Sequence, residues 1–228
     1  IGVLSVSGLS FSLGMSIAAS AGQSLPILLL ITALTAIVFG MGMPTTAVYI
    51  LMATLLAPVL VLAGVEPLAA HLFVLYFGVL SMITPPVCIA SFAAASMAGA
   101  KFMRTGVESL RFGIVAFIVP FLLVASPSLL LTGDTDWVQA GIAMSTAIFG
   151  CFLLAAGFEA YLFKVLNWPR RMVAVVAGLL LMFPESGNIV FIPGFPTDQV
   201  GFVMAVALMI WNWQQARKIA SLKDTAPI

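Results

Sequence analysis

Long uncharged stretches separated by short charged groups run along the whole chain. A helix that crosses a membrane needs about 20 apolar residues. No charged residue occurs from Ile1 to Val65, and the later uncharged runs are 67–100, 112–133, 137–158, 172–184, 186–197 and 199–216. Because most of these runs are long enough for a helical span, the pattern predicts an all-α, polytopic membrane protein.

Basic and acidic groups alternate between these runs. The basic groups are Lys101, Arg104 and Arg111, then Lys164, Arg170 and Arg171, then Arg217, Lys218 and Lys223. Acidic residues lie between them, at Glu66, Asp134, Asp136, Glu185 and Asp198. Basic loops stay in the cytoplasm, so we expect the basic groups inside and the acidic loops outside.

The segment 25–64 begins and ends on the same predicted outer side. A continuous helix of 40 residues would extend about 60 Å, twice the hydrocarbon thickness, so the segment must turn back. Its middle, Gly40-Met41-Gly42-Met43-Pro44-Thr45-Thr46, has the glycines and proline of a turn. Two full spans and a re-entrant hairpin both fit. The short arms and the lack of a basic residue at the tip favour the re-entrant hairpin.

The segment 67–100 contains a second interruption. Ile83-Thr84-Pro85-Pro86-Val87 follows an apolar helix and precedes an Ala/Ser-rich one. Two adjacent prolines remove two helical hydrogen bonds and disfavour helical geometry at the residue before each. The sequence therefore predicts a proline-broken transmembrane helix with a half-helix on each side.

Composition narrows the class of protein. Hydrophobic residues make up 62% of the 228 residues and charged residues 7%, which excludes a soluble enzyme and a disordered chain. The net charge of +1 and the absence of a long basic cluster give no sign of a nucleic-acid partner. Cys88 and Cys151 lack metal-ligand or disulfide spacing. We expect the lipid bilayer as the surroundings and, since the chain begins at Ile1, a longer polypeptide.

Unwound backbone in hydrocarbon persists only where protein, water, ions or substrate satisfy it. Transporters use such breaks as binding sites, with carbonyl dipoles for cations and amides for anions. Neutral oxygens suffice for sodium, which we place mainly on backbone carbonyls near Thr84 and Gly40. We predict no catalytic residue and no cofactor beyond sodium as coupling ion. The candidate substrate and ion contacts are Gly40, Gly42, Pro44, Thr45, Thr46, Ser81, Thr84, Pro85, Pro86 and Ser91.

Two stretches carry a family resemblance. GMGMPTTAVYILMATLLAP (40–58) and ITPPVCIASFAAASMAGA (83–100) resemble the second structural repeat in the large membrane subunit of tripartite ATP-independent periplasmic (TRAP) transporters. The chain is most similar to fused permeases that work with a TAXI-type binding protein. Residues 1–132 resemble the second transport repeat, with a helix, the hairpin 25–64, the broken helix 67–100 and a helix over 112–132. Residues 133–228 resemble the extra C-terminal transmembrane helices of that subgroup.

The resemblance implies half of an inverted-repeat transporter in the bacterial cytoplasmic (inner) membrane. Such a permease imports small organic anions, such as carboxylates, keto acids or amino acids, with a sodium or other cation gradient. Its partners would be a periplasmic TAXI-type substrate-binding protein, the missing N-terminal repeat and the small-subunit helices. Alternatives are a non-transporting membrane scaffold subunit, a channel and an intramembrane enzyme. The enzyme is disfavoured because the single histidine, His71, lies near a helix end, where we expect a hydrogen-bonded interfacial side chain.

Overall fold

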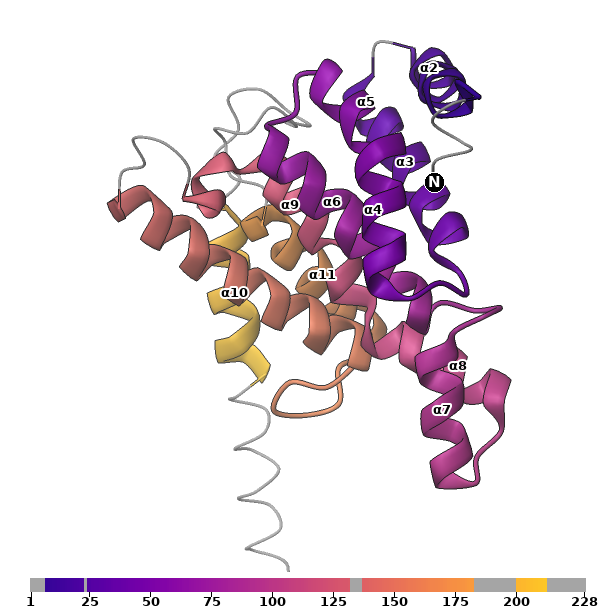
Figure 1. Cartoon of the computed structure of the whole chain (residues 1–228). Coiled ribbons are helices and arrows are strands. Elements are labelled where there is room, and N and C mark those ends of the chain that lie inside the picture. The colour runs from indigo at the N-terminus through magenta and orange to yellow at the C-terminus, as the bar shows by residue number, and fades with distance from the viewer. Residues whose placement is uncertain (1–6, 23, 132–136, 183–199, 213–228) are drawn as a thin grey trace, which may run out of the picture. The chain divides into compact units, whose positions relative to one another are not determined.

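In the computed structural model, the described residues are 7–22, 24–131, 137–182 and 200–212 (Figure 1). Every regular element in these ranges is a helix, apart from one isolated β-bridge between Tyr161 and Val165. The predicted all-α fold class is therefore confirmed. The chain forms two compact units, residues 1–130 and 131–228. The boundary predicted after residue 132 falls in the segment 132–136, outside the described residues.

A helical hairpin occupies the first part of unit 1. Helix α2 (Leu9–Ala21) is followed by α3 (Leu25–Gly40), the outgoing arm of the hairpin. The chain then turns at 41–44 and returns as α4 (Thr45–Leu55), which lies beside α3, and continues as α5 (Ala57–Leu62) (Figure 1). The returning arm is interrupted at Leu56 because Pro58 has no N–H to donate to the carbonyl of Thr54.

A second helix with a break follows the hairpin. Helix α6 (Pro67–Leu80) begins with Glu66 as its N-cap, whose carboxylate accepts a 2.8 Å hydrogen bond from the Ala69 amide. The helix tightens into η1 (Ser81–Ile83), and α7 (Ile89–Ala98) starts only after five non-helical residues. The proline-broken helix predicted over 67–100 is present, and its break lies at 84–88.

The last part of unit 1 differs from the sequence prediction. Helix α8 (Phe102–Phe112) precedes three short elements, η2 (Ile114–Phe117), α9 (Val119–Ala125) and η3 (Pro127–Leu130). The single helix expected over 112–132 was therefore wrong for the described residues. Pro120 and Pro127 cannot donate backbone hydrogen bonds, and each stands at the start of a new short helix. The chain bends by 61° between α8 and Ile114–Ala125.

Helix α6 lies at the centre of unit 1. It packs against both arms of the hairpin and also against α9. Phe73 and Phe77 of α6 meet Phe121 of α9 with ring centroids 5.2 and 5.6 Å apart, and Phe117 of η2 lies 6.2 Å from Phe77. Such edge-on ring contacts stabilise helix packing beyond the area that they bury. These ring contacts fix α6 against α9, and separate contacts fix it against the hairpin.

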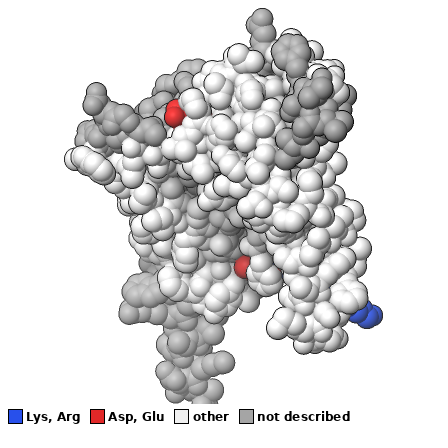
Figure 2. All heavy atoms as spheres, viewed as in Figure 1, with Lys and Arg blue, Asp and Glu red and all other residues white. Residues whose placement is uncertain are grey.

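Large apolar side chains also cover the outside of the helices. On α3, Leu30, Leu34 and Val38 are 56%, 59% and 64% exposed although the opposite face is buried. Figure 2 shows that the described residues visible on one face are almost entirely uncharged. Among the described residues, two helical segments are long and apolar enough to cross a membrane: Thr45–Leu62, which is α4 and α5 together, and Trp137–Glu159. The number is three if α8 and Ile114–Ala125 form one bent span. An outer surface of this kind is the one expected in contact with lipid.

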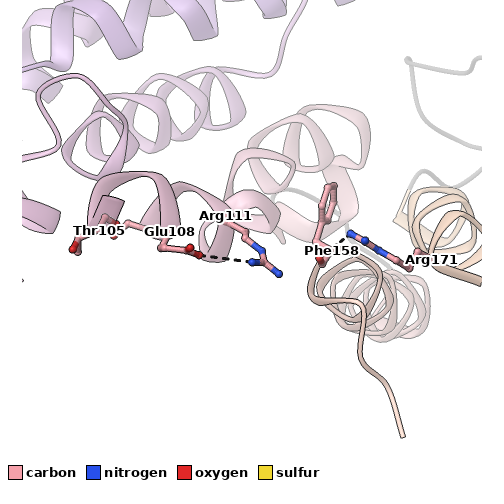
Figure 3. Close-up of polar contacts among 6 residues, drawn as sticks. Thr105, Glu108, Arg111, Phe158 and Arg171 are labelled. Carbon is pink, nitrogen blue, oxygen red and sulfur yellow. Dashed lines mark hydrogen bonds and ion pairs between the residues drawn. The ribbon is translucent and has the colours of Figure 1, made fainter. Parts of the chain in front are cut away.

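Unit 2 consists of closely packed helices. Helix α10 (Trp137–Glu159) packs against α11 (Trp168–Met182), and Gly150 and Gly178 allow the two backbones to touch. A Cβ atom on Gly150 would lie 2.8 Å from the Gly178 carbonyl oxygen. Arg171 reaches back to the end of α10 and donates to the carbonyl oxygens of Gly157 and Phe158 (Figure 3). A third described helix, Val200–Asn212, contributes Ala205 and Leu208 to the core of this unit.

Candidate functional site

The tip of the hairpin is a four-residue turn between two helix ends. Helix α3 ends at Gly40, and the amide of Met43 lies 3.5 Å from the Gly40 carbonyl oxygen. Gly42 adopts φ +82°, a left-handed conformation that glycine tolerates without strain. Pro44 stands immediately before α4, and its carbonyl accepts the first helical bond, 3.0 Å from the Val48 amide. Thr45 and Thr46 therefore form the first turn of the returning helix.

The second interruption begins where η1 ends. Thr84 has an extended backbone, the Pro85–Pro86 peptide bond is cis, and Cys88 has φ +21°. The hydroxyl of Thr84 donates to the Leu80 carbonyl at 2.7 Å, and the Cys88 amide donates to the Thr84 carbonyl at 3.3 Å. The five residues thus form a compact turn between two helix ends, rather than a kink within one helix.

The hairpin touches the end of α6 at Gly40, the last residue of α3, which has no side chain. A Cβ atom on Gly40 would lie 2.7 Å from both the Gly78 carbonyl oxygen and Ser81 Oγ. Ser81 is buried, and its hydroxyl donates to the same Gly78 carbonyl at 2.6 Å. A Cβ atom on Gly78 would overlap Val48 Cγ1 of α4. Both arms of the hairpin therefore close on the last turn of α6, directly before the break.

The prolines leave a backbone acceptor at the end of η1. The donors that would reach Ser81 and Met82 in a continuing α-helix belong to Pro85 and Pro86, which have no N–H. The Ser81 carbonyl instead accepts from the Thr84 amide at 3.2 Å. Met82 has no helical donor available at the corresponding position. A free carbonyl dipole at a helix C-terminus is attractive for a cation.

Three buried hydroxyl groups in unit 1 have no hydrogen-bond partner in the described structure. Ser91, in the first turn of α7, is 3% exposed, Thr32, in the middle of α3, is fully buried, and Ser126, between α9 and η3, is 4% exposed. A buried hydroxyl without a partner costs free energy, so each is a position where a water or an ion would be stabilised. The sequence analysis included Ser91 but missed Thr32. The available signal was a threonine on an otherwise apolar arm.

The candidate residues do not form one cluster. Gly40 and Ser81 touch, and Thr84, Pro85 and Pro86 follow directly in the chain. Pro44, Thr45 and Thr46 are exposed, and a Cβ atom on Gly42 would meet nothing within 4 Å. The tip consequently presents its threonines outward, while its glycine end packs on α6.

Helix α8 supports the break from another side, which the sequence analysis did not predict. A Cβ atom on Gly106 would lie 2.7 Å from Cys88 Sγ and 3.6 Å from Pro85 Cγ. Seven residues later, on the same face, a Cβ atom on Gly113 would lie 2.7 Å from Ile83 Cδ1. The signal available was the pair of glycines at helical spacing in an otherwise strongly amphipathic segment.

The remaining candidate chemistry is accounted for by packing. His71 Nδ1 lies 3.2 Å from the Tyr49 hydroxyl, and the two rings meet edge to face. The expectation of a hydrogen-bonded histidine is therefore confirmed. Among the described residues, no group of three or more His, Cys, Asp or Glu side chains is placed to hold a metal ion.

The fold and the two interruptions define a multi-pass α-helical membrane protein with a helical hairpin packed against a broken helix. Residues 1–138 match the family model described as the DctM component of the tripartite ATP-independent periplasmic transporter. Since the match covers more than half of the chain, the protein belongs to this family. Searches of curated proteins and of solved structures found no match.

Membership of this family gives the general role. The DctM component is the large membrane subunit of a TRAP transporter, so the chain is part of a membrane permease and not of an enzyme. The large component works with a periplasmic binding protein and a small membrane subunit. The apolar helices agree with a multi-pass location in a membrane.

Proposed function

We propose that the chain forms the second transport repeat and the C-terminal helices of a cation-coupled permease of the bacterial inner membrane. The permease imports small organic anions, such as carboxylates, keto acids or amino acids. A TAXI-type periplasmic protein delivers the substrate, and sodium is the coupling ion. The hairpin is re-entrant, and the two interruptions provide this repeat's half of the binding site.

The contact of Gly40 with the last turn of α6 carries this proposal. It brings the end of one interrupted element against the other, so that both helix ends lie in the same region of unit 1. Unwound main chain in a membrane protein is retained mainly where it lines a cavity or binds a solute. Glycine at position 40 allows α3 and α6 to approach more closely than a side chain would permit.

The two kinds of helix end suit the two kinds of solute. The last turns of α3 and η1 present carbonyl oxygens near Gly40 and Thr84, which attract a cation. The first turns of α4 and α7 present amides and the hydroxyls of Thr45, Thr46 and Ser91, which suit a carboxylate. Sodium fits better than a proton because carbonyl and hydroxyl oxygens can coordinate sodium but do not gain or lose a proton near neutral pH.

The test is uptake of radiolabelled organic anions into proteoliposomes that contain the assembled permease, with its binding protein outside. Thr84→Val removes one candidate sodium ligand and keeps the side-chain shape. If the Thr84 oxygen binds sodium, the sodium concentration for half-maximal uptake should rise by about tenfold, the effect of losing one polar interaction. Thr54→Val is the matched control, because the Thr54 hydroxyl also bonds to the carbonyl four residues earlier but lies away from the break.

Two results would contradict the assignment. Uptake that is independent of sodium in the unmodified permease would remove sodium as the coupling ion. Unchanged uptake after Thr84→Val combined with Gly40→Ala and Thr45→Val would remove the two interruptions as the binding site. A permease that binds its partner protein but never accumulates solute would instead indicate a scaffold subunit.

A further inference from the structure

Helix α8 has three distinct faces. The first, with Gly106 and Gly113, packs against the break as described above. The second carries charged side chains at helical spacing, where three basic residues accompany a single carboxylate: Lys101, Arg104, Glu108 and Arg111. Lys101 and Arg104 are exposed, and Glu108 lies 3.8 Å from Arg111 in a half-exposed ion pair (Figure 3).

The third face is apolar and exposed. Met103 and Val107 are both 54% exposed, and they lie one turn apart, between the packed face and the basic face. Two large exposed apolar side chains beside a row of charges make the outward side of α8 amphipathic. When an amphipathic helix lies at a lipid surface, its apolar side chains enter the acyl region and its basic side chains reach the headgroups.

A sharp bend separates α8 from the apolar segment that follows it. Gly113, where the bend lies, packs directly on Ile83 at the end of η1. The 61° bend at Gly113 then turns α8 away from the direction of the apolar segment Ile114–Ala125.

We infer that α8 is an interfacial helix that docks on anionic phospholipid. The phosphates of the lipid headgroups bind Lys101 and Arg104, and the acyl chains cover Met103 and Val107. The net positive charge of the exposed face selects anionic over zwitterionic lipid. Because the opposite face of the same helix packs on Pro85 and Cys88, the lipid contact also holds the break in place. This last step rests on the proposed transport function, whereas the lipid contact does not.

The lipid contact is tested by photo-crosslinking in the assembled permease. Val107 is replaced by benzoylphenylalanine, and the protein is reconstituted with equal amounts of phosphatidylglycerol and phosphatidylcholine, irradiated and digested. Mass spectrometry then gives the ratio of the two lipid adducts. The expected ratio is at least about fivefold in favour of phosphatidylglycerol, the preference given by one basic residue near a surface. In Lys101→Gln/Arg104→Gln it should fall below about twofold.

Two matched variants separate charge at α8 from general effects. Lys101→Arg/Arg104→Lys keeps both charges and should keep the lipid ratio. Lys164→Gln removes a charge from the loop of unit 2 and should also leave the ratio unchanged. Equal labelling of both lipids, an adduct with a protein chain, or no lipid adduct would each overturn the docking of α8 on anionic lipid.

The coupling to the break has a separate readout. Uptake should rise with the fraction of phosphatidylglycerol, and this dependence should be lost in Lys101→Gln/Arg104→Gln. Gly106→Ala should keep the lipid ratio but lower uptake, because its Cβ atom would push α8 away from Cys88. Uptake that does not change with the fraction of phosphatidylglycerol would overturn the coupling between the lipid contact and the break. Absence of any organic-anion uptake would overturn the proposed function while leaving the crosslinking result intact.

Discussion

Gly40 and Ser81 face each other so closely that a Cβ atom on the glycine would lie 2.7 Å from the serine oxygen. The serine hydroxyl is already engaged with the Gly78 carbonyl and has no space to move away, because Ser81 is only 1% exposed. The contact joins the last residue of α3 to the first residue of η1. The hairpin and the broken helix are therefore in direct contact at Gly40 and Ser81.

Gly40→Ala should destabilise unit 1. Backbone carbonyls cannot rotate away as side chains do, so the added methyl group must separate α3 from α6, at a cost of about 1–3 kcal/mol. Thermal unfolding of the purified permease in detergent should show a lower midpoint. Gly141→Ala is the control, because a Cβ atom on Gly141 of α10 would meet nothing within 4 Å. Equal midpoints for the two variants would contradict the close contact.

Thr32→Val should leave thermal stability unchanged or raise it. The Thr32 hydroxyl is fully buried without a partner in the described structure, and valine has nearly the same shape without the polar atom. Thr35→Val on the same helix is the comparison, since Thr35 donates to the Ile31 carbonyl at 2.8 Å and should lose that bond. A drop in stability for Thr32→Val larger than for Thr35→Val would show that the Thr32 hydroxyl binds something in the folded protein.

Arg171→Lys should destabilise unit 2 although the charge is kept. The guanidinium of Arg171 donates from Nε to Gly157 and from a terminal nitrogen to Phe158, at 3.1 and 3.2 Å. These carbonyls belong to the last turn of α10, where a positive charge is also favourable. Lysine cannot donate in this forked geometry, so we expect a loss of about 1–3 kcal/mol in the free energy of unfolding.

The control for Arg171→Lys is Arg104→Lys, on the exposed face of α8. Its guanidinium lies outside the packed core, and its thermal midpoint should stay within error of the unmodified protein. Equal losses at both positions would indicate that lysine is poorly tolerated in general. They would remove the specific role of Arg171 at the end of α10.

Tyr49→Phe should weaken the contact between α4 and α6. The Tyr49 hydroxyl and His71 Nδ1 are 3.2 Å apart, and phenylalanine keeps the edge-to-face ring contact but removes the hydrogen bond. The expected loss is about 1 kcal/mol, measured as a small drop in the thermal midpoint. Tyr76→Phe, at an exposed position of α6, should cause no comparable drop. A similar effect at both positions would indicate that the Tyr49–His71 bond adds nothing.

Much of the fold follows from where charges and prolines stand in the sequence. The break at 84–88 was predictable because Pro85 and Pro86 remove two consecutive helical donors. The turn at 41–44 was predictable because Gly42 and Pro44 both disfavour a continuous helix. Local chemistry was sufficient in both cases, because it acts on the chain whatever packs around it.

The contacts between elements were not predictable in the same way. Nothing in the spacing of Gly40 and Ser81 indicates that these two residues touch, since the contact depends on how α3 lies across α6. Gly106 looked like one small residue in an amphipathic helix, and its fit against Cys88 appears only once the helices are packed. The helix expected over 112–132 was wrong for a related reason. The apolar run is long enough for one span, but Pro120 and Pro127 each start a new short helix within it.

The corner at Gly113 has a consequence for how unit 1 can move. Before the corner, α8 packs against the Pro85–Cys88 turn, and after it the rings of Phe117 and Phe121 pack against α6. The segments on the two sides of Gly113 therefore contact both the break and the helix that precedes it. Such a brace resists flexing at the interruption, so any large displacement during a transport cycle should carry α6, the interruption and α8 along as one rigid block.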